Sequence, residues 1–498
     1  MFNLFKSKVR TRFAPSPTGY LHIGGLRTAL YAYLWAKKNK GTFFLRIEDT
    51  DQSREVEGAV AGLINSLKLT GVIPDEGIIS ESNGKINEKG HFGPYTQSKR
   101  LHIYQKYVQK LIESGQAYYC FCTPERLEGL RKSQESAKQP TRYDGLCKEL
   151  SAQEIETRIK AGEKYVIRMK VPVNRVIEFN DLIRGKISVH SKEIDDQVLM
   201  KADGFPTYHL AHIVDDHLMK TSLIIRGEEW LPSTPKHLLL FEAFGWTAPQ
   251  YAHLSLILNP DKTKLSKRQG DVAVEDYLDK GYLPEALVNY VALLGWNPGT
   301  EQEIFSLPEL IKEFSFDNVH KAGAVFDLKK LDWMNSEYLK KMSLDKFVEV
   351  AKPYLKKNIK NIADNLDLRK ILFLEQQRIS KLTEVGEGLN FFFDNDLKFD
   401  PQILIWKKSN VETAKKSLEL LAEELEKHTD WSKNSLEQFL IKLIKDRGLS
   451  NGEVLWPFRV ALTGLEKSPT PFEIAEILGK KKTLTRIKQA IDKLNSII

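Results

Sequence analysis

The most constraining feature of this chain is a strand, a glycine-containing loop, a helix and a second strand in direct succession near its start. Residues 9–14 predict a short strand, and residues 15–19 a turn rich in proline and glycine. Residues 26–37 predict a helix, and residues 43–47 an apolar strand. This order is typical of a parallel βαβ unit, so we expect an α/β Rossmann-type catalytic domain with its ligand at the carboxyl ends of the strands. Residues 78–94 lack apolar periodicity and predict a surface loop or an insertion.

The length and charge of the chain suit a modular protein with a polyanionic partner. Its 498 residues are enough for about three or more domains. Lys and Arg (74) exceed Asp and Glu (66), and the net charge of +8 favours nucleic acid but also fits an ordinary mixed-sign surface. No apolar stretch is long enough to cross a bilayer, and the residues before Arg10 lack the apolar core of a signal peptide. We expect a cytoplasmic protein with no membrane partner.

The last third of the chain carries apolar residues at helical spacing, beginning with Val411, Ala414 and Leu418. Three pairs at capping-box spacing predict where its helices begin. These are Ser409 with Glu412, Ser435 with Gln438, and Thr470 with Glu473, the last helix ending near Gly479. We expect an all-helical C-terminal domain.

Two distant motifs carry the chemistry: His22-Ile23-Gly24-Gly25 after the first strand, and the basic run at residues 264–268. Alone, each fits an ordinary helix start or a solvated loop as well as a functional site. Together they predict an ATP site, because glycines at a helix start let the backbone approach phosphates and the helix N-terminus favours negative charge. Two lysines of the run would stabilise the charge that develops when a carboxylate attacks the α-phosphate, with Mg²⁺ arriving with ATP.

Several stretches in order resemble one family. Residues 12–25 and 46–51 closely resemble the glutamyl- and glutaminyl-tRNA synthetases. Residues 203–217, 226–230 and 326–335, with the lysine run, extend the resemblance over nearly the whole chain. It implies a class I aminoacyl-tRNA synthetase that activates L-glutamate with ATP and transfers it to the 3′ end of tRNA(Glu), releasing AMP and diphosphate. The helical end favours the bacterial-type glutamate branch, because glutaminyl enzymes typically end in β-barrels.

The same resemblance assigns two sets of site residues. Glutamate would be bound by Arg12, Ser16, Glu48, Tyr208 and Arg226. ATP would be bound by His22, Gly24, Gly25, Glu229, Lys264 and Lys267, of which His22, Lys264 and Lys267 would be catalytic. The chemistry agrees, because an arginine can pair bidentately with the side-chain carboxylate of glutamate while a carboxylate accepts from its ammonium group.

The resemblance also implies a division of the chain into domains. The Rossmann catalytic domain would occupy residues 1–107 and 209–260, interrupted by an α+β insertion at residues 108–208 that binds the acceptor stem. Residues 261–344 would form a stem-contact region, and residues 345–498 a helical anticodon-binding domain. The partners would be tRNA(Glu), and tRNA(Gln) if the enzyme is non-discriminating, and the expected state is a monomer.

Three closely spaced cysteines form a candidate metal site. Cys120, Cys122 and Cys147 resemble the structural zinc site of part of this family, where a tyrosine placed like Tyr143 can complete the set. Glu149 stands where some relatives have histidine and is the alternative fourth ligand. Zn²⁺ would fix a segment that has little apolar periodicity to hold it. The alternative is that three reduced cysteines pack as small hydrophobic side chains.

Three other functions would leave different patterns in the sequence. A glutaminyl-tRNA synthetase should be rich in strands after residue 345, which the sequence does not indicate. A truncated relative that glutamylates a modified tRNA base lacks the anticodon domain. A catalytically dead RNA-binding paralogue should have lost His22 or the lysines, and all are intact.

Replacing Lys267 with alanine should lower the rate of adenylation much more than the affinity for tRNA, because its charge is needed mainly in the transition state. Pyrophosphate exchange with tRNA present measures the first quantity, and equilibrium tRNA binding measures the second. An equal loss of both would contradict this role.

Overall fold

The computed structural model describes residues 8–82, 84–265, 272–359, 362 and 367–497. The chain divides into two compact units, Met1–Leu331 and Asp332–Ile498, and the boundary falls within helix α11 (Leu328–Lys341). Among the described helices, none combines the length and the apolar character that a membrane span requires.

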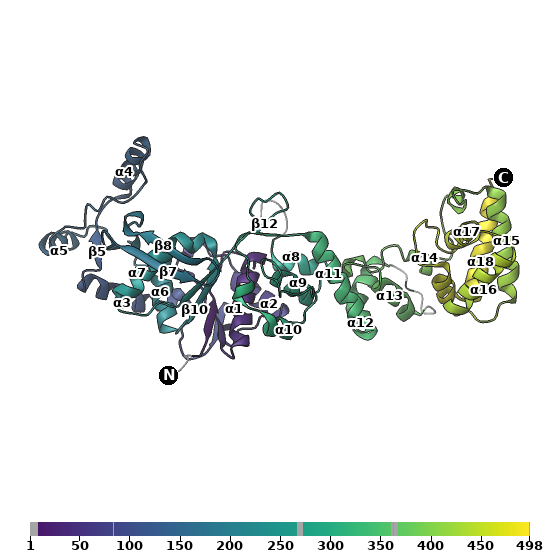
Figure 1. Ribbon diagram of the computed structural model, residues 1–498, viewed down its shortest axis with the longest axis horizontal. Helices are drawn as coiled ribbons and strands as arrows, with labels where there is room; N and C mark the ends of the chain where they lie inside the picture. The colour runs from purple at the N-terminus through teal and green to yellow at the C-terminus, as the bar shows by residue number, and fades with distance from the viewer. Residues whose placement is uncertain (1–7, 83, 266–271, 360–361, 363–366, 498) are drawn as a thin grey trace. The chain divides into compact units, whose positions relative to one another are not determined.

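The first unit is built on an eight-stranded sheet with the order β4-β3-β2-β1-β10-β11-β7-β8 (Figure 1). In that order the strands are Lys85–Lys89, Glu76–Ser82, Thr42–Leu45, Arg10–Phe13, Leu223–Gly227, Gln250–Leu254, Val176–Asp181 and Gly185–His190. The strands from β3 to β7 in this order pair in parallel, whereas β4 and β8 are antiparallel edge strands.

The predicted βαβ unit is confirmed. Strands β1 and β2 pair in parallel with Arg12 opposite Phe44, and helix α1 (Ile23–Lys38) connects them. From β1 the chain builds β2 and β3 on one side of the sheet, and later returns to build β10 and β11 on the other. This reversal places a topological switch point between β1 and β10, where open α/β sheets bind their ligands.

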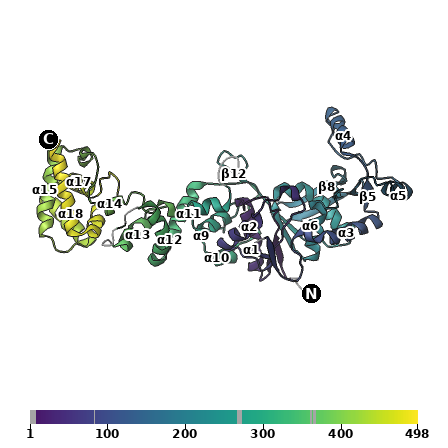
Figure 2. The same ribbon diagram turned by 180° about the vertical axis from the view of Figure 1, so that it is seen from behind.

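The other helices of the first unit cover this sheet or extend from it (Figure 1). They are α2 (Ala59–Leu69), α3 (Leu101–Glu113), α4 (Pro124–Ser136), α5 (Ala152–Lys160), α6 (Tyr208–Leu218), α7 (Thr234–Ala243), α8 (Val274–Asp279), α9 (Pro284–Ala292) and α10 (Leu307–Glu313). Seen from behind, α4 and α5 again lie beside β5, at the end of this unit away from α9 and α10 (Figure 2).

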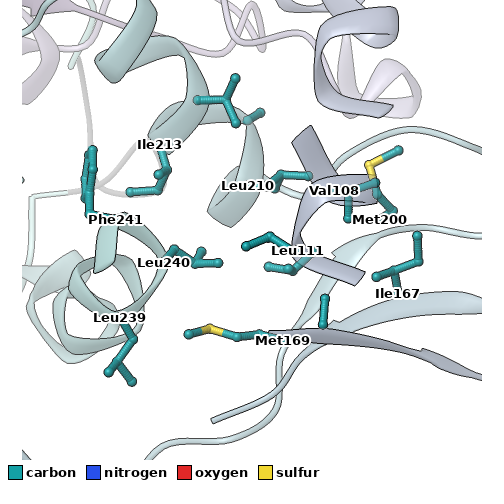
Figure 3. Packing of buried hydrophobic residues seen from close by; sticks show 14 of the residues in the cluster. Val108, Leu111, Ile167, Met169, Met200, Leu210, Ile213, Leu239, Leu240 and Phe241 are labelled. Atoms are coloured by element: carbon teal, nitrogen blue, oxygen red, sulfur yellow. The ribbon is translucent and has the colours of Figure 1, made fainter. Parts of the chain in front are cut away.

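Two smaller sheets complete the first unit. One is the antiparallel sheet of β5 (Ala117–Cys120), β6 (Val166–Met169) and β9 (Val198–Met200), and the other pairs β12 (Ile257–Leu258) with β13 (Ala324–Val325). Figure 3 shows a core between the first of these sheets and helices α3, α6 and α7. It includes Val108, Leu111, Ile167, Met169, Met200, Leu210, Ile213, Leu239, Leu240 and Phe241.

This core and the main sheet both cross the expected limits of the insertion. The predicted insertion at residues 108–208 contains β7 and β8, which extend the main sheet from β11. Its small sheet shares a core with α6 and α7, which follow it in the chain. The insertion is therefore packed onto the catalytic domain, and the domain limits themselves stay a prediction.

Strands β3 and β4 form a hairpin over most of residues 78–94. The prediction of a loop there was therefore wrong for these strands. Strand β4 lies at the sheet edge and buries no residue fully, so it needs no apolar alternation. Its polar sequence was therefore mistaken for a loop.

Among its described residues the second unit contains helices joined by turns and loops, and no strand. The expectation of a helical C-terminal region is confirmed. Its helices are α12 (Leu344–Asn358), α13 (Leu368–Gln376), α14 (Asn390–Phe393), α15 (Val411–Lys427), α16 (Lys433–Asp446), α17 (Asn451–Thr463) and α18 (Pro471–Asn495).

Of the three predicted caps in this unit, one is confirmed. Thr470 and Glu473 form the capping box of α18, and the backbone at Gly479 is not helical (φ 70°, ψ 171°), so the first of two helices that meet there at a kink ends near Gly479 as predicted. Asn410 caps α15 in place of Ser409, and Ser432 caps α16 in place of Ser435. Both errors arose because several capping residues stand side by side, so that spacing alone did not decide between them.

Candidate active site

A cavity of about 580 Å³ opens at the switch point of the main sheet. Arg12 and Ser16 line it from the end of β1, Glu48 from the segment after β2, Arg226 from β10, and Tyr208 from the start of α6. These are the five residues predicted to bind glutamate, and the fold brings all of them to one cavity.

A network of buried charges lies beneath this cavity. Arg12 donates to both carboxylate oxygens of Asp216, from Nε at 3.0 Å and from Nη2 at 3.2 Å. Arg46 donates from Nη1 to Asp216 Oδ1 at 2.9 Å and from Nη2 to Glu48 Oε1 at 2.8 Å. Burial opposes ionisation of Asp216, but Arg12 and Arg46 outweigh it and hold the pKa of Asp216 well below its usual value.

The neighbouring carboxylate extends the network away from the cavity. Asp215 accepts from Arg100 Nε at 2.7 Å, from Gln97 Nε2 at 2.9 Å and from the Tyr104 hydroxyl at 2.8 Å. Arg12, Arg46 and Arg100 thus face Glu48, Asp215 and Asp216, and the six formal charges sum to zero.

Arg226 has a different environment, although it lies at the same cavity and only 5% of its surface is exposed. Its guanidinium donates to His253 Nε2 at 3.0 Å, to Thr234 Oγ1 at 2.8 Å and to the Tyr208 hydroxyl oxygen at 3.3 Å. A fourth side-chain partner is His237 Nδ1 at 3.2 Å. Within the described residues no carboxylate pairs directly with Arg226, so its buried positive charge has no ion-pair partner at the cavity.

The histidines around Arg226 do not add to this charge. Burial, together with nearby cations, lowers the pKa of His237 well below its usual value and that of His209 to about 4. Burial also lowers the pKa of His253, against the opposing effect of Asp181. At neutral pH these rings are therefore uncharged hydrogen-bonding partners.

Those residues predicted to bind ATP that the structure describes lie outside the lining of this cavity. His22 caps α1, and its Nδ1 accepts from the backbone N–H of Gly24 at 2.9 Å, so Gly24 and Gly25 form the first turn of that helix. The Glu229 carboxylate packs against Gly227, which lines the cavity. Lys264 is exposed and forms a β-bridge with Leu258, whereas Lys267 is outside the described residues.

The sequence assigned no role to several residues that build the site. Lys201 and Trp230 line the cavity, and Arg46, Asp215 and Asp216 hold it from beneath. Adjacent acids within an apolar helical stretch were an available signal, because a buried carboxylate needs a cationic or hydrogen-bonding partner.

The three cysteines lie together in the small sheet region. The sulfur atoms of Cys120, Cys122 and Cys147 are all within 4.8 Å of one another. The Tyr143 hydroxyl lies 3.4 Å from the sulfurs of both Cys120 and Cys122, and accepts from Cys147 N at 3.0 Å. Glu149 is exposed and is not part of this cluster. The three thiols can supply three of the four ligands of a tetrahedral zinc site, and the Tyr143 hydroxyl is a further oxygen that contacts this cluster.

Comparisons with known proteins point to one family. Residues 8–333 match the family described as tRNA synthetases class I (E and Q), catalytic domain, and residues 346–491 match an anticodon binding domain. The chain is 50% identical over 494 residues to a glutamate–tRNA ligase of Clostridium botulinum (strain Hall) and 49% identical over 495 residues to one of Clostridium tetani, each covering 99% of both chains. A glutamate tRNA ligase from Elizabethkingia meningosepticum, solved in complex with its amino acid, superimposes with a TM-score of 0.88 at 40% identity, covering 98% of this chain and 100% of that one.

Replacing Asp216 with asparagine should lower the free energy of unfolding at pH 7 by about 3–5 kcal/mol, because it leaves buried arginine charge without compensation. Since the pKa of Asp216 is depressed in the fold, its contribution is complete above about pH 4 and is lost as the pH falls through the lower folded value. Urea unfolding at several pH values measures both effects. The control is Glu242→Gln at the exposed Arg175–Glu242 pair, which should change little. Equal effects of the two substitutions would contradict the role of Asp216.

Proposed function

The chain belongs to the class I tRNA synthetases (E and Q), and on that premise we propose that it activates L-glutamate with ATP and joins it to tRNA(Glu), the reaction of a glutamate–tRNA ligase. The observation that carries the proposal is the buried guanidinium of Arg226 at the cavity, with which no carboxylate among the described residues pairs directly. The side chain of glutamate supplies the carboxylate that this buried cation lacks among the described residues. The neutral amide of glutamine does not.

The other cavity residues fit the remaining groups of glutamate. Glu48 accepts from the substrate ammonium with the oxygen that is not bound to Arg46, and Ser16 and Tyr208 offer hydroxyl groups. Arg12 is occupied by Asp216 on two nitrogens, and its Nη1 makes only a 3.5 Å contact with the Ile225 carbonyl. This nitrogen is the part of Arg12 that we assign to the substrate.

ATP is the second substrate of a class I synthetase. We assign its binding to His22, Gly24 and Gly25 at the start of α1, with Glu229, Lys264 and Lys267. The glutamate α-carboxylate attacks the α-phosphorus, the bond to the leaving pyrophosphate breaks, and glutamyl-adenylate forms. Lys264 and Lys267 stabilise the charge on the pyrophosphate, and Mg²⁺ accompanies ATP. A ribose hydroxyl at the 3′ end of tRNA then attacks the acyl carbon and releases AMP.

The proposed domains divide the contacts with tRNA. Residues 108–208 bind the acceptor stem, residues 261–344 contact the stem, and residues 345–498 bind the anticodon. The match of residues 346–491 to an anticodon binding domain supports the last assignment. The enzyme acts as a monomer in the cytoplasm, where its three cysteines stay reduced.

Aminoacylation with labelled glutamate or glutamine, on tRNA(Glu) and tRNA(Gln) in separate reactions, tests the proposal. Glutamate should be attached to tRNA(Glu), and attachment to tRNA(Gln) as well would make the enzyme non-discriminating. Arg226→Gln should raise the KM for glutamate by about tenfold or more, the effect of losing a hydrogen bond to a charged group, without a similar change for ATP. Attachment of glutamine alone would overturn this account of the cavity.

We further propose that Cys120, Cys122, Cys147 and Tyr143 hold a structural Zn²⁺. The bound ion supplies rigidity to this segment and takes no part in the reaction. The Tyr143 hydroxyl already contacts two of the three sulfurs, whereas Glu149 points to solvent, which favours Tyr143 as the fourth ligand.

Elemental analysis of purified protein should give about one zinc per chain, as expected for a single four-ligand site. Cys147→Ser should lose the metal, and Tyr143→Phe should lose it to a chelator faster than the wild type. Glu149→Gln is the matched control and should bind zinc normally. Retention of zinc by Tyr143→Phe with loss by Glu149→Gln would make Glu149 the ligand, and metal-free wild type would favour three packed thiols.

A further inference from the structure

We propose that Asp181 is a positioning residue for Arg226 and acts through His253. The inference rests on the proposed role of Arg226 as the receptor for the substrate carboxylate. The three residues lie on adjacent strands of the main sheet: Asp181 ends β7, His253 is in β11, and Arg226 is in β10. In the parallel register His253 pairs with Arg226, and Tyr251 pairs with Asp181. The sheet itself therefore aligns the three side chains.

The contacts form a continuous chain of buried side chains that reaches the cavity at Arg226. Asp181 Oδ2 lies 2.6 Å from His253 Nδ1, and His253 Nε2 lies 3.0 Å from Arg226 Nε. The exposed fractions are 1% for Asp181, 0% for His253 and 5% for Arg226. The hydrogen bond to His253 is made by Nε, the guanidinium nitrogen next to the aliphatic part of Arg226. The position of the His253 ring therefore helps to fix where the two outer nitrogens of Arg226 point.

The direction of each hydrogen bond follows from the chemistry of the groups. A guanidinium can only donate, so His253 Nε2 must accept from Arg226. In a neutral imidazole the other nitrogen then carries the proton, and His253 Nδ1 donates to Asp181. Asp181 thus favours the one neutral tautomer of His253 that can accept a hydrogen bond from Arg226.

Asp181 can hold its charge in this buried place because it is well supplied with donors. Its Oδ1 accepts from the backbone N–H groups of Ile183 at 2.9 Å and Arg184 at 2.8 Å. Its Oδ2 accepts from the backbone N–H of His253 at 3.2 Å as well as from the ring. Burial opposes ionisation, but these hydrogen bonds outweigh it and lower the pKa of Asp181.

The intervening ring also separates two opposite charges. Arg12 touches the carboxylate of Asp216 directly, so its charge is largely compensated. Arg226 meets Asp181 only through a neutral imidazole, and its charge stays available to a ligand. Asp181 thereby orients the cation without occupying the place of the substrate carboxylate.

The variant Asp181→Asn keeps the shape of the side chain but changes its hydrogen-bonding groups, so it tests whether Asp181 orients His253. An asparagine has one accepting oxygen and one donating nitrogen, whereas both oxygens of Asp181 face donors. If the nitrogen faces His253, the ring must move its proton to Nε2, where it confronts the Nε–H of Arg226. If the nitrogen faces the turn, it confronts the N–H groups of Ile183 and Arg184.

The first measurement is steady-state aminoacylation by Asp181→Asn. We expect the KM for glutamate to rise by about tenfold, as for the loss of a hydrogen bond to a charged group, with the KM for ATP and tRNA within about twofold of wild type. Gly185→Ala is the matched control, since it strains the same turn at φ +80° where an added Cβ has open space. It should lower the melting temperature and leave the KM for glutamate unchanged. A similar KM increase in Gly185→Ala would make Asp181 a turn residue only.

A double-mutant cycle tests whether Asp181 acts through His253. If it does, Asp181→Asn added to His253→Gln should change the KM for glutamate by less than about twofold, because the link is already broken. Additive effects of the two substitutions would overturn the proposal.

A spectroscopic measurement decides the question without catalysis. In protein labelled with ¹⁵N-histidine, the His253 signals, assigned by their absence in His253→Gln, should show the proton on Nδ1. In Asp181→Asn this tautomer should be reduced or lost. A proton on Nε2 in the wild type would overturn the proposal even if glutamate is attached normally. Failure of the wild type to attach glutamate would instead reject the proposed function and leave the tautomer result standing.

Discussion

Three arginines and three carboxylates face one another beneath the cavity with almost no access to water, and the site depends on this buried network. Arg46 lies at its centre, because it joins Glu48 after β2 to both acids of α6. Burying such ions adds little stability compared with an apolar core, whereas removing one partner costs several kcal/mol. The consequence of the network is therefore geometric: β1, β2 and α6 can approach only in the arrangement that satisfies every charge.

Because the network sums to zero, it leaves the buried positive charge of Arg226 uncompensated. Arg12 and Arg226 carry the same group and line the same cavity, but their partners give them different tasks. Arg12 donates to Asp216 from two nitrogens and is part of the buried network that supports the site. Arg226 is held by hydroxyl groups, imidazoles and a carbonyl, so it is rigid without being neutralised. Selectivity for an anionic side chain therefore depends on the groups that surround each arginine. The residue type alone does not reveal it.

The different environments of Arg12 and Arg226 could not be predicted from the sequence, although other features of the fold and the site could. The order of strand, glycine loop and helix was sufficient for the βαβ unit, and resemblance placed five residues at one cavity. The polar edge strand β4 was missed because a strand that buries no face carries no alternation. Asp181 and His253 were missed for a physical reason as well. They meet Arg226 only because β7, β11 and β10 are neighbours in the sheet, and no local spacing encodes that adjacency.

The same cation also orders the histidines on its other side. Arg226 Nη2 can only donate, so His237 accepts at Nδ1 and offers its Nε2 proton to His209 Nδ1, 2.9 Å away. Protonating His237 would place a donor against the guanidinium, and burial already lowers its pKa. The pKa of His209 is about 4, so it too is neutral at physiological pH. Histidines usually make a site sensitive to pH, but here burial, assisted by nearby cations that include Arg226, keeps His209 and His237 neutral, so they add no charge beside Arg226 across the neutral range.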